Sequence, residues 1–225
     1  MRGALTLLLF SAPLCPAATP IALTDADVAR ALRQALVQGA DRAVVQLGRH
    51  DGFLSNQAVR IPVPPSLART DALLRKVGMR KYSDQLITAM NRAAEQAVPE
   101  ARVLLVEAVS RMSIADAKAV LNGADDAATQ YFRRHTETVL AAHLQPIVRQ
   151  ATQRVQVAEA YNQYAGRAAR FGLIKKADAD LDAYVTRKAL EGLYLTIAAE
   201  ERAIRNDPIQ QGTGLLRRVF GSLVE

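Results

Sequence analysis

Apolar side chains that recur at helical intervals constrain the fold of this 225-residue chain more than any other feature. In the segment from Asp25 to Gly48 they form one stripe, made of Val28, Leu32, Ala35, Leu36, Gly39, Ala43 and Leu47. No segment shows the sustained alternation of a β-strand. Aromatic residues are only 5% of the chain and Trp is absent, so Ala, Leu, Val and Ile must fill the core. We therefore predict an all-α protein that folds as a single multi-helix bundle.

Capping residues and prolines predict where the helices begin and end. Two pairs have the spacing of a capping box, Thr24 with Asp27 and Ser113 with Asp116. Ser66 and Ser83 are expected to cap two further helices, and Pro99 to stop the second of these and open the next. Asp125 and Asp126 favour another helix start. After that start we predict a long helix with a kink or restart at Pro146 and then a helix at about 155–170. A further helix is opened by Asp178–Asp182 and closed by Asp207 and Pro208, and a short C-terminal helix follows.

The segment Ile61–Pro65 cannot be helical, because three of its last four residues are proline. We predict that it forms one extended, Pro-rich arm across the bundle. No internal repeat and no low-complexity linker divides the chain, which favours a single domain.

The first residues have the pattern of a secretory signal peptide. Met1–Gly3 carries one positive charge and runs into the apolar stretch Ala4–Phe10, which is followed by prolines and small residues. We predict a signal peptide at 1–18, a single all-helical domain at 19–225, and a periplasmic location. Cys15 suggests the lipid-modified cysteine of a lipoprotein, but Leu14 is larger than the residue that normally precedes such a cysteine, so lipid anchoring is not expected.

The residues that could carry out catalysis or bind a metal are few. His135 and His143 are eight residues apart, and neither has a partner at the three- or four-residue spacing of helical zinc ligands. The acids Asp178, Asp180 and Asp182 resemble the start of a calcium loop, but the Gly and Glu that such a loop needs later are absent. We predict a non-enzymatic protein with no catalytic residues, no metal and no cofactor.

The positive charge is concentrated in one part of the chain. Between Ala128 and Lys176, eight basic residues stand against two acidic ones, and the rest of the chain beyond the signal peptide is balanced. Tyr131, Phe132, Tyr161 and Tyr164 lie in the same part, and we predict that they contact an apolar ligand. Arg133 and Arg134 are predicted to meet an acidic headgroup or an anionic membrane surface. Arg interleaved with aromatic residues also suits single-stranded nucleic acid, but an exported protein is not expected to meet it.

Several stretches of the sequence resemble the family of exported bacterial proteins known as domain of unknown function 4197. They are Asp51–Phe53, Ala58–Pro62, Met90–Glu95, Asp125–Arg133, Pro146–Val148, Asp180–Asp182, Tyr184–Thr186 and Ile204–Pro208. The resemblance implies an all-helical exported protein, in some members a lipoprotein, with no activity generally assigned.

Polar residues in these stretches stand where helix packing does not require them, namely Asp51, Arg60, Asn91, Arg92 and Glu95. We interpret them as a structural network of ion pairs and hydrogen bonds that fixes the arm, with a polar ligand contact as the alternative.

The function predicted from the sequence is that of a periplasmic helical binding module for a lipid or another apolar small molecule. The alternative is a cell-envelope interaction or scaffolding protein, whose surface binds an envelope protein and no small molecule.

Overall fold

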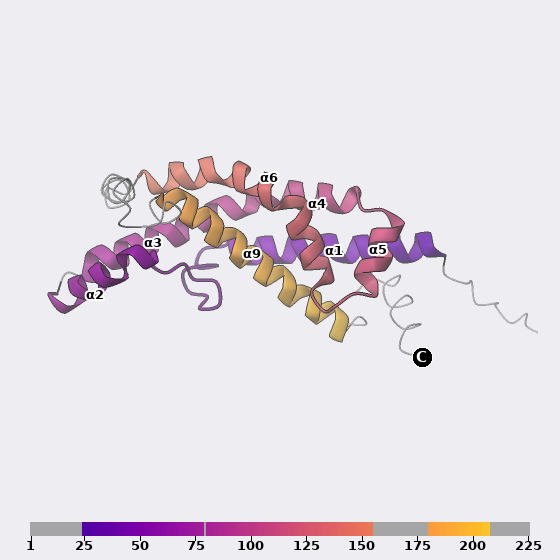
Figure 1. The fold of residues 1–225 in the computed structure, drawn as a ribbon, viewed down its shortest axis with the longest axis horizontal. Helices are drawn as coiled ribbons and strands as arrows, with labels where there is room; N and C mark the ends of the chain where they lie inside the picture. The colour runs from indigo at the N-terminus through magenta and orange to yellow at the C-terminus, as the bar shows by residue number, and fades with distance from the viewer. Residues whose placement is uncertain (1–23, 79, 155–179, 208–225) are drawn as a thin grey trace, which may run out of the picture.

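The computed structural model describes residues 24–78, 80–154 and 180–207 (Figure 1). The chain is all-α there. The α-helices are α1 (Asp25–Gly48), α2 (Ala68–Lys76), α3 (Arg80–Ala97), α4 (Ala101–Ser110), α5 (Ile114–Leu121), α6 (Ala127–Thr152) and α9 (Leu181–Asn206), with short 3-10 turns at η1 (Pro65–Leu67) and η2 (Val98–Glu100). The predicted helices at 155–170 and at the C-terminus, and the signal peptide, lie outside the described residues.

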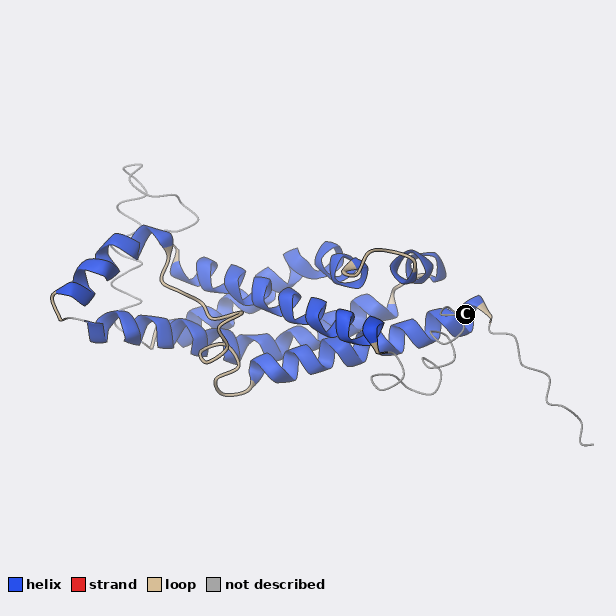
Figure 2. Ribbon diagram, turned by 90° about the horizontal axis from the view of Figure 1, so that it is seen from below, coloured by secondary structure: helices blue, strands red, loops and turns tan. Residues whose placement is uncertain are grey.

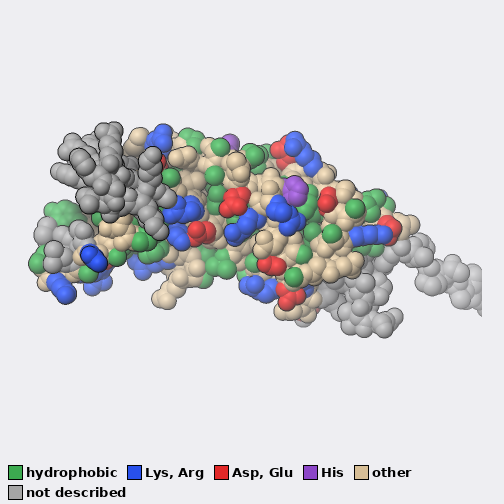
Figure 3. Space-filling view, viewed as in Figure 1, with side chains coloured by type: hydrophobic (Ala, Val, Ile, Leu, Met, Phe, Trp, Pro, Cys, Tyr) green, Lys and Arg blue, Asp and Glu red, His purple; other side chains and the backbone are tan. Residues whose placement is uncertain are grey.

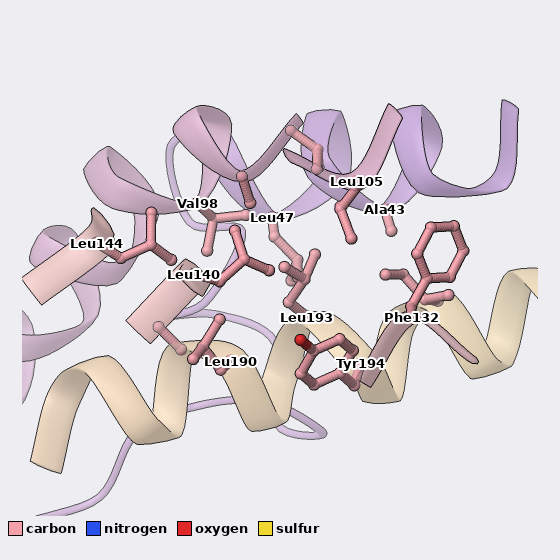
Figure 4. Close-up of a cluster of buried hydrophobic side chains, with 14 of the residues drawn as sticks. Ala43, Leu47, Val98, Leu105, Phe132, Leu140, Leu144, Leu190, Leu193 and Tyr194 are labelled. Carbon is pink, nitrogen blue, oxygen red and sulfur yellow. The ribbon is translucent and has the colours of Figure 1, made fainter. Parts of the chain in front are cut away.

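The described helices form an elongated bundle (Figures 1 and 2). Among them, α6 and α9 have the most extensive contact with each other. The α2–α3 turn stands at one end of the long axis in both views. Charged side chains of both signs are scattered over the face seen in Figure 3. Side chains of α1, α4, α6 and α9 meet in one core, which includes Leu47, Leu105, Phe132 and Leu193 (Figure 4). None of the helices in the described ranges combines the length and the low polarity that a membrane span requires.

Helix α1 has the bounds predicted from the sequence. Thr24 accepts a hydrogen bond from the backbone N–H of Asp27, and the Asp27 carboxylate accepts one from the Thr24 N–H at 3.2 Å, which completes the capping box. The predicted box at Ser113 and Asp116 is also present, at the start of α5. These two predictions are confirmed because a capping box depends only on residues within one helical turn.

The prediction that Ser83 caps a helix was wrong. Helix α3 begins at Arg80, so Ser83 lies inside its first turn and is buried. Gly78 adopts a φ of 80°, in the left-handed region where Gly is favoured, and this makes the α2–α3 turn very short. Hydrogen bonds from Arg75 and then from Ser83 lower the pKa of Asp71, so Ser83 links α3 to α2.

The segment between α1 and η1 is not helical, as predicted, and it crosses α3 and α9. At its start a Cβ on Gly52 would collide with the carbonyl oxygen of Leu47, so only Gly fits there. Phe53 is fully buried, and its ring lies against Gly192 of α9, where a Cβ would come within 2.8 Å of Cε1. Further along, the Tyr184 hydroxyl of α9 donates to the carbonyl oxygen of Pro62 at 3.2 Å.

The two ends of α6 are held by two buried carboxylates of α9. At the start of α6, Glu201 accepts from the backbone N–H groups of Ala128 and Thr129, each at 2.9 Å. Asp126 stands at the N-cap position as expected, but its side chain makes no capping hydrogen bond, because Glu201 occupies that role. Near the other end, the Thr152 hydroxyl donates to Asp182. Two contacts of this kind, at opposite ends of α9, fix the register of the two helices.

Candidate functional site

Asn91 is a buried polar residue of α3 that holds the arm through its backbone. Its side-chain oxygen accepts from the Ile61 N–H at 2.8 Å, and its amide nitrogen donates to the Ile61 carbonyl at 2.9 Å. The same nitrogen donates to the Ile87 carbonyl one turn back at 2.7 Å. Asn91 therefore pairs with Ile61 as a neighbouring β-strand would, and it leaves no backbone polar group of that residue unsatisfied.

Glu95 and Arg92 fix the start of the arm. The buried carboxylate of Glu95 accepts from the N–H groups of Phe53 and Leu54 at 3.0 and 3.1 Å. Arg92 bridges Glu95 at 2.6 Å and Asp51 at 2.7 Å. Asp51 has a φ of 66°, and the hydrogen bond from Arg92 lowers the pKa of its carboxyl group. The hydrogen bond with Glu95 is the main cause that raises the pKa of Arg92.

Four of the five residues predicted to form a polar network thus lie together, on α3 and at the arm. Arg60 does not join them, because its side chain is exposed and forms no ion pair within the described part of the chain.

The described residues among those predicted to contact a ligand do not lie on one surface. Tyr131 and Phe132 are 3% and 1% exposed and belong to the core, where the Tyr131 hydroxyl donates to the Ala108 carbonyl. Burial raises the pKa of Tyr131. Arg133 lies over the ring of Tyr194, with its Cζ atom 5.0 Å from the ring centre, and Arg134 is exposed on α6. Tyr161 and Tyr164 lie outside the described residues.

The acidic residues and histidines do not gather into a metal site in the described part of the chain, where no group of three potential ligands occurs. Asp180 is the N-cap of α9 and accepts from the Ala183 N–H at 3.0 Å, and Asp182 is paired with Thr152. His135 stacks on Tyr131 with 4.1 Å between the ring centres. Asp178 lies outside the described residues.

An open groove of about 1010 Å³ runs along the outer side of α3, next to the end of α6. Its α3 wall is one helical stripe, because Lys81, Gln85, Ala89, Arg92 and Gln96 are spaced three or four residues apart. Ala151 of α6 adds small apolar surface. Tyr82 stands at the α3 start of the groove, and its side chain is 50% exposed.

Basic residues line this groove, and two of them lack an acidic partner among the residues that the structure describes. Arg80 pairs with Asp84 at 3.3 Å, and Arg92 is held by Asp51 and Glu95. Lys81 and Arg154 form no ion pair with any residue of the described ranges. The groove therefore combines small apolar side chains with two available cations, which is a surface suited to a molecule that is partly apolar and partly anionic.

The sequence reasoning missed this groove. Ala89 and Ala151 are far apart in the sequence, and a small side chain that lines a groove has the same sequence signal as one packed in the core. The run Arg80–Tyr82, two cations followed by an aromatic residue at a helix start, was the one local signal that pointed to it.

The fold and the groove define a class, that of all-α bundle proteins with an open, basic surface groove and a polar-anchored arm. The chain belongs to the family described as protein of unknown function DUF4197, whose profile matches residues 22–221. No curated protein and no solved structure matches the chain.

Proposed function

We propose that this protein is a periplasmic, non-enzymatic binding module for a small amphipathic molecule of the lipid class, one that carries an anionic group. The observation that carries the proposal is the groove on α3, which is lined both by small apolar side chains and by two cations that have no acidic partner in the described ranges. In this proposal the ligand contacts Lys81, Ala89 and Arg154 rather than the aromatic residues of α6.

The size of the groove supports a ligand of this class. Its volume of about 1010 Å³ is at the upper end of the range of small-molecule sites, which is about 300–1,000 Å³. Each fully buried CH₂ group supplies about 0.8 kcal/mol, so eight carbons in an open groove contribute at most roughly 6 kcal/mol before the cost of association. An anionic end would lie between Lys81 and Arg154. Arg92 is less suited to it, because two carboxylates already neutralise its charge.

The first test is whether the purified protein carries or takes up such a molecule. Native mass spectrometry with lipid extraction is expected to find bound lipid, and calorimetric titration with dodecanoate is expected to show saturable binding. A protein that is empty, and that neither binds dodecanoate nor melts at a higher temperature with it, would refute the proposal. If crosslinking in cells instead gives one dominant protein adduct, the scaffolding alternative is favoured.

The second test locates the site. Ala89→Phe fills the groove and is expected to weaken dodecanoate binding at least tenfold, whereas Ala199→Phe, on the exposed side of α9, should leave it unchanged. Replacing both Lys81 and Arg154 with Gln should weaken binding of dodecanoate much more than binding of uncharged dodecanol. Equal effects of the two Phe variants would place the ligand elsewhere.

A further inference from the structure

The turn between α2 and α3 projects from the end of the bundle (Figures 1 and 2). Helix α2 packs mainly on α3 and η1. At the turn, Gly78 has no atom within 4 Å of the position of a Cβ, and Val77 and Tyr82 are 62% and 50% exposed. We call this surface the tip, and it consists of Arg69, Arg75, Lys76, Val77, Arg80, Lys81 and Tyr82.

The tip is basic, and the described residues neutralise only part of its charge. Residues 68–84 contain five basic and two acidic residues. Arg75 forms ion pairs with both acidic residues, with Asp71 at 2.9 Å and with Asp84 at 3.2 Å. Arg80 also pairs with Asp84. The other three cations, Arg69, Lys76 and Lys81, form no ion pair within the described ranges. Lys and Arg side chains are visible at this end of the molecule in Figure 3.

We propose that the tip docks on an anionic lipid bilayer. Free cations next to exposed apolar side chains at a projecting turn suit such a surface, because the cations meet the headgroups while Val77 enters the upper acyl region. A Tyr such as Tyr82 is favoured at the depth of the headgroups. The sequence placed membrane contact at Arg133 and Arg134, but Arg133 lies against the ring of Tyr194.

This proposal is independent of the ligand of the groove, although Lys81 and Tyr82 belong to both surfaces. Docking through the tip would bring the α3 start of the groove to the bilayer surface. The experiments below use Arg69, Lys76 and Val77, which do not line the groove, so failure of one proposal leaves the other standing.

A single introduced Trp reports insertion, since the chain has no Trp of its own. Val77→Trp is expected to shift its emission to the blue and to be quenched by brominated lipid when vesicles with phosphatidylglycerol are added. Val103→Trp, at a site on α4 of similar exposure (68%), should show neither change. Circular dichroism checks that both variants keep their helices. The absence of a shift for Val77→Trp, or the same shift in both variants or on neutral phosphatidylcholine vesicles, would overturn the proposal.

Cosedimentation with the same vesicles tests the cations. The double variant Arg69→Gln and Lys76→Gln is expected to bind roughly 30-fold more weakly, since each basic residue near an anionic surface contributes about fivefold. The matched control, Arg134→Gln with Arg202→Gln, removes two exposed arginines from α6 and α9 that likewise form no ion pair in the described part of the chain. It should bind nearly as the wild type does. Equal losses in the two double variants would show an effect of net charge alone and would overturn docking through the tip.

Discussion

Replacement of Gly192 by Ala tests how the arm is seated on the bundle. A Cβ at Gly192 would lie 2.8 Å from Cε1 of Phe53 and 3.2 Å from the Cβ of Val59. Both neighbours are buried, so neither is a flexible side chain that swings out of the way. Gly39, in the middle of α1, is the matched control, because a Cβ there would meet its nearest neighbours at 3.6 and 3.7 Å, an ordinary contact distance.

The two substitutions share the gain in helix propensity and differ in steric cost. Ala in place of Gly within a helix stabilises by about 0.5–1 kcal/mol. Gly39→Ala should therefore raise the free energy of unfolding by about that amount. Overpacking in a filled core costs about 1–3 kcal/mol. The free energy of unfolding of Gly192→Ala should therefore be lower than that of Gly39→Ala by about this overpacking cost.

Urea denaturation followed by circular dichroism measures the free energy of unfolding of both variants, and the comparison holds if their m-values are the same. A cycle with Phe53→Leu then assigns the cause, because the smaller side chain gives the new methyl group room and most of the cost of Gly192→Ala should disappear. If Gly192→Ala is as stable as Gly39→Ala, or if Phe53→Leu leaves its cost unchanged, the close packing of Phe53 on Gly192 is not what limits this position.

Two further predictions concern buried polar groups. Glu201→Gln should lower the free energy of unfolding by roughly 2–4 kcal/mol in the same urea assay, since Gln has one acceptor oxygen for the donors that the carboxylate now serves. Glu200→Gln should cost less than about 1 kcal/mol, since Glu200 is partly exposed and its partner Arg42 is 3.6 Å away. Similar losses in both variants would contradict the capping role of Glu201. Burial raises the pKa of Tyr194 from 10.0 to about 12, so the stability linked to this hydroxyl is fully present below pH 10 and is lost as the pH rises toward 12. Between these pH values the wild type should lose about 2–3 kcal/mol more stability than Tyr194→Phe does, and parallel pH curves would show that the hydroxyl is not buried as described.

Features that depend on neighbours in the sequence could be predicted from it. The ends of α1 follow from Thr24 and Asp27 at one end and from the change in pattern after Gly48 at the other. The extended arm follows from its prolines, because a ring that fixes φ and removes the N–H acts at its own position and at the one before.

Features that depend on contacts across the fold could not be predicted in the same way. Asp126 has the right chemistry for a cap at the start of α6, yet the cap comes from Glu201, 72 residues after Thr129. Nothing local to Glu201 distinguishes it from Glu200, whose side chain is 21% exposed and pairs with Arg42 instead.

The candidate site shows the same division. Asn91, Arg92 and Glu95 could be predicted because they are polar residues on a helix whose other residues indicate a core-facing side. In the structure all three side chains help to hold the arm. The groove gave no such contrast, since Ala89 and Ala151 are ordinary residues for a helical bundle and only their placement makes them line a pocket.

The carboxylates of Asp182 and Glu201 have a consequence for how the chain folds during its synthesis. They hold both ends of α6 but belong to α9, which is made after it. Arg205 also reaches back to the Val120 carbonyl at 2.9 Å, at the end of α5. The nascent middle of the chain therefore keeps unsatisfied helix ends until the last third has emerged. Chain fragments that stop before Glu201 should stay open to proteases at α5 and α6, even though every residue of those helices is already present.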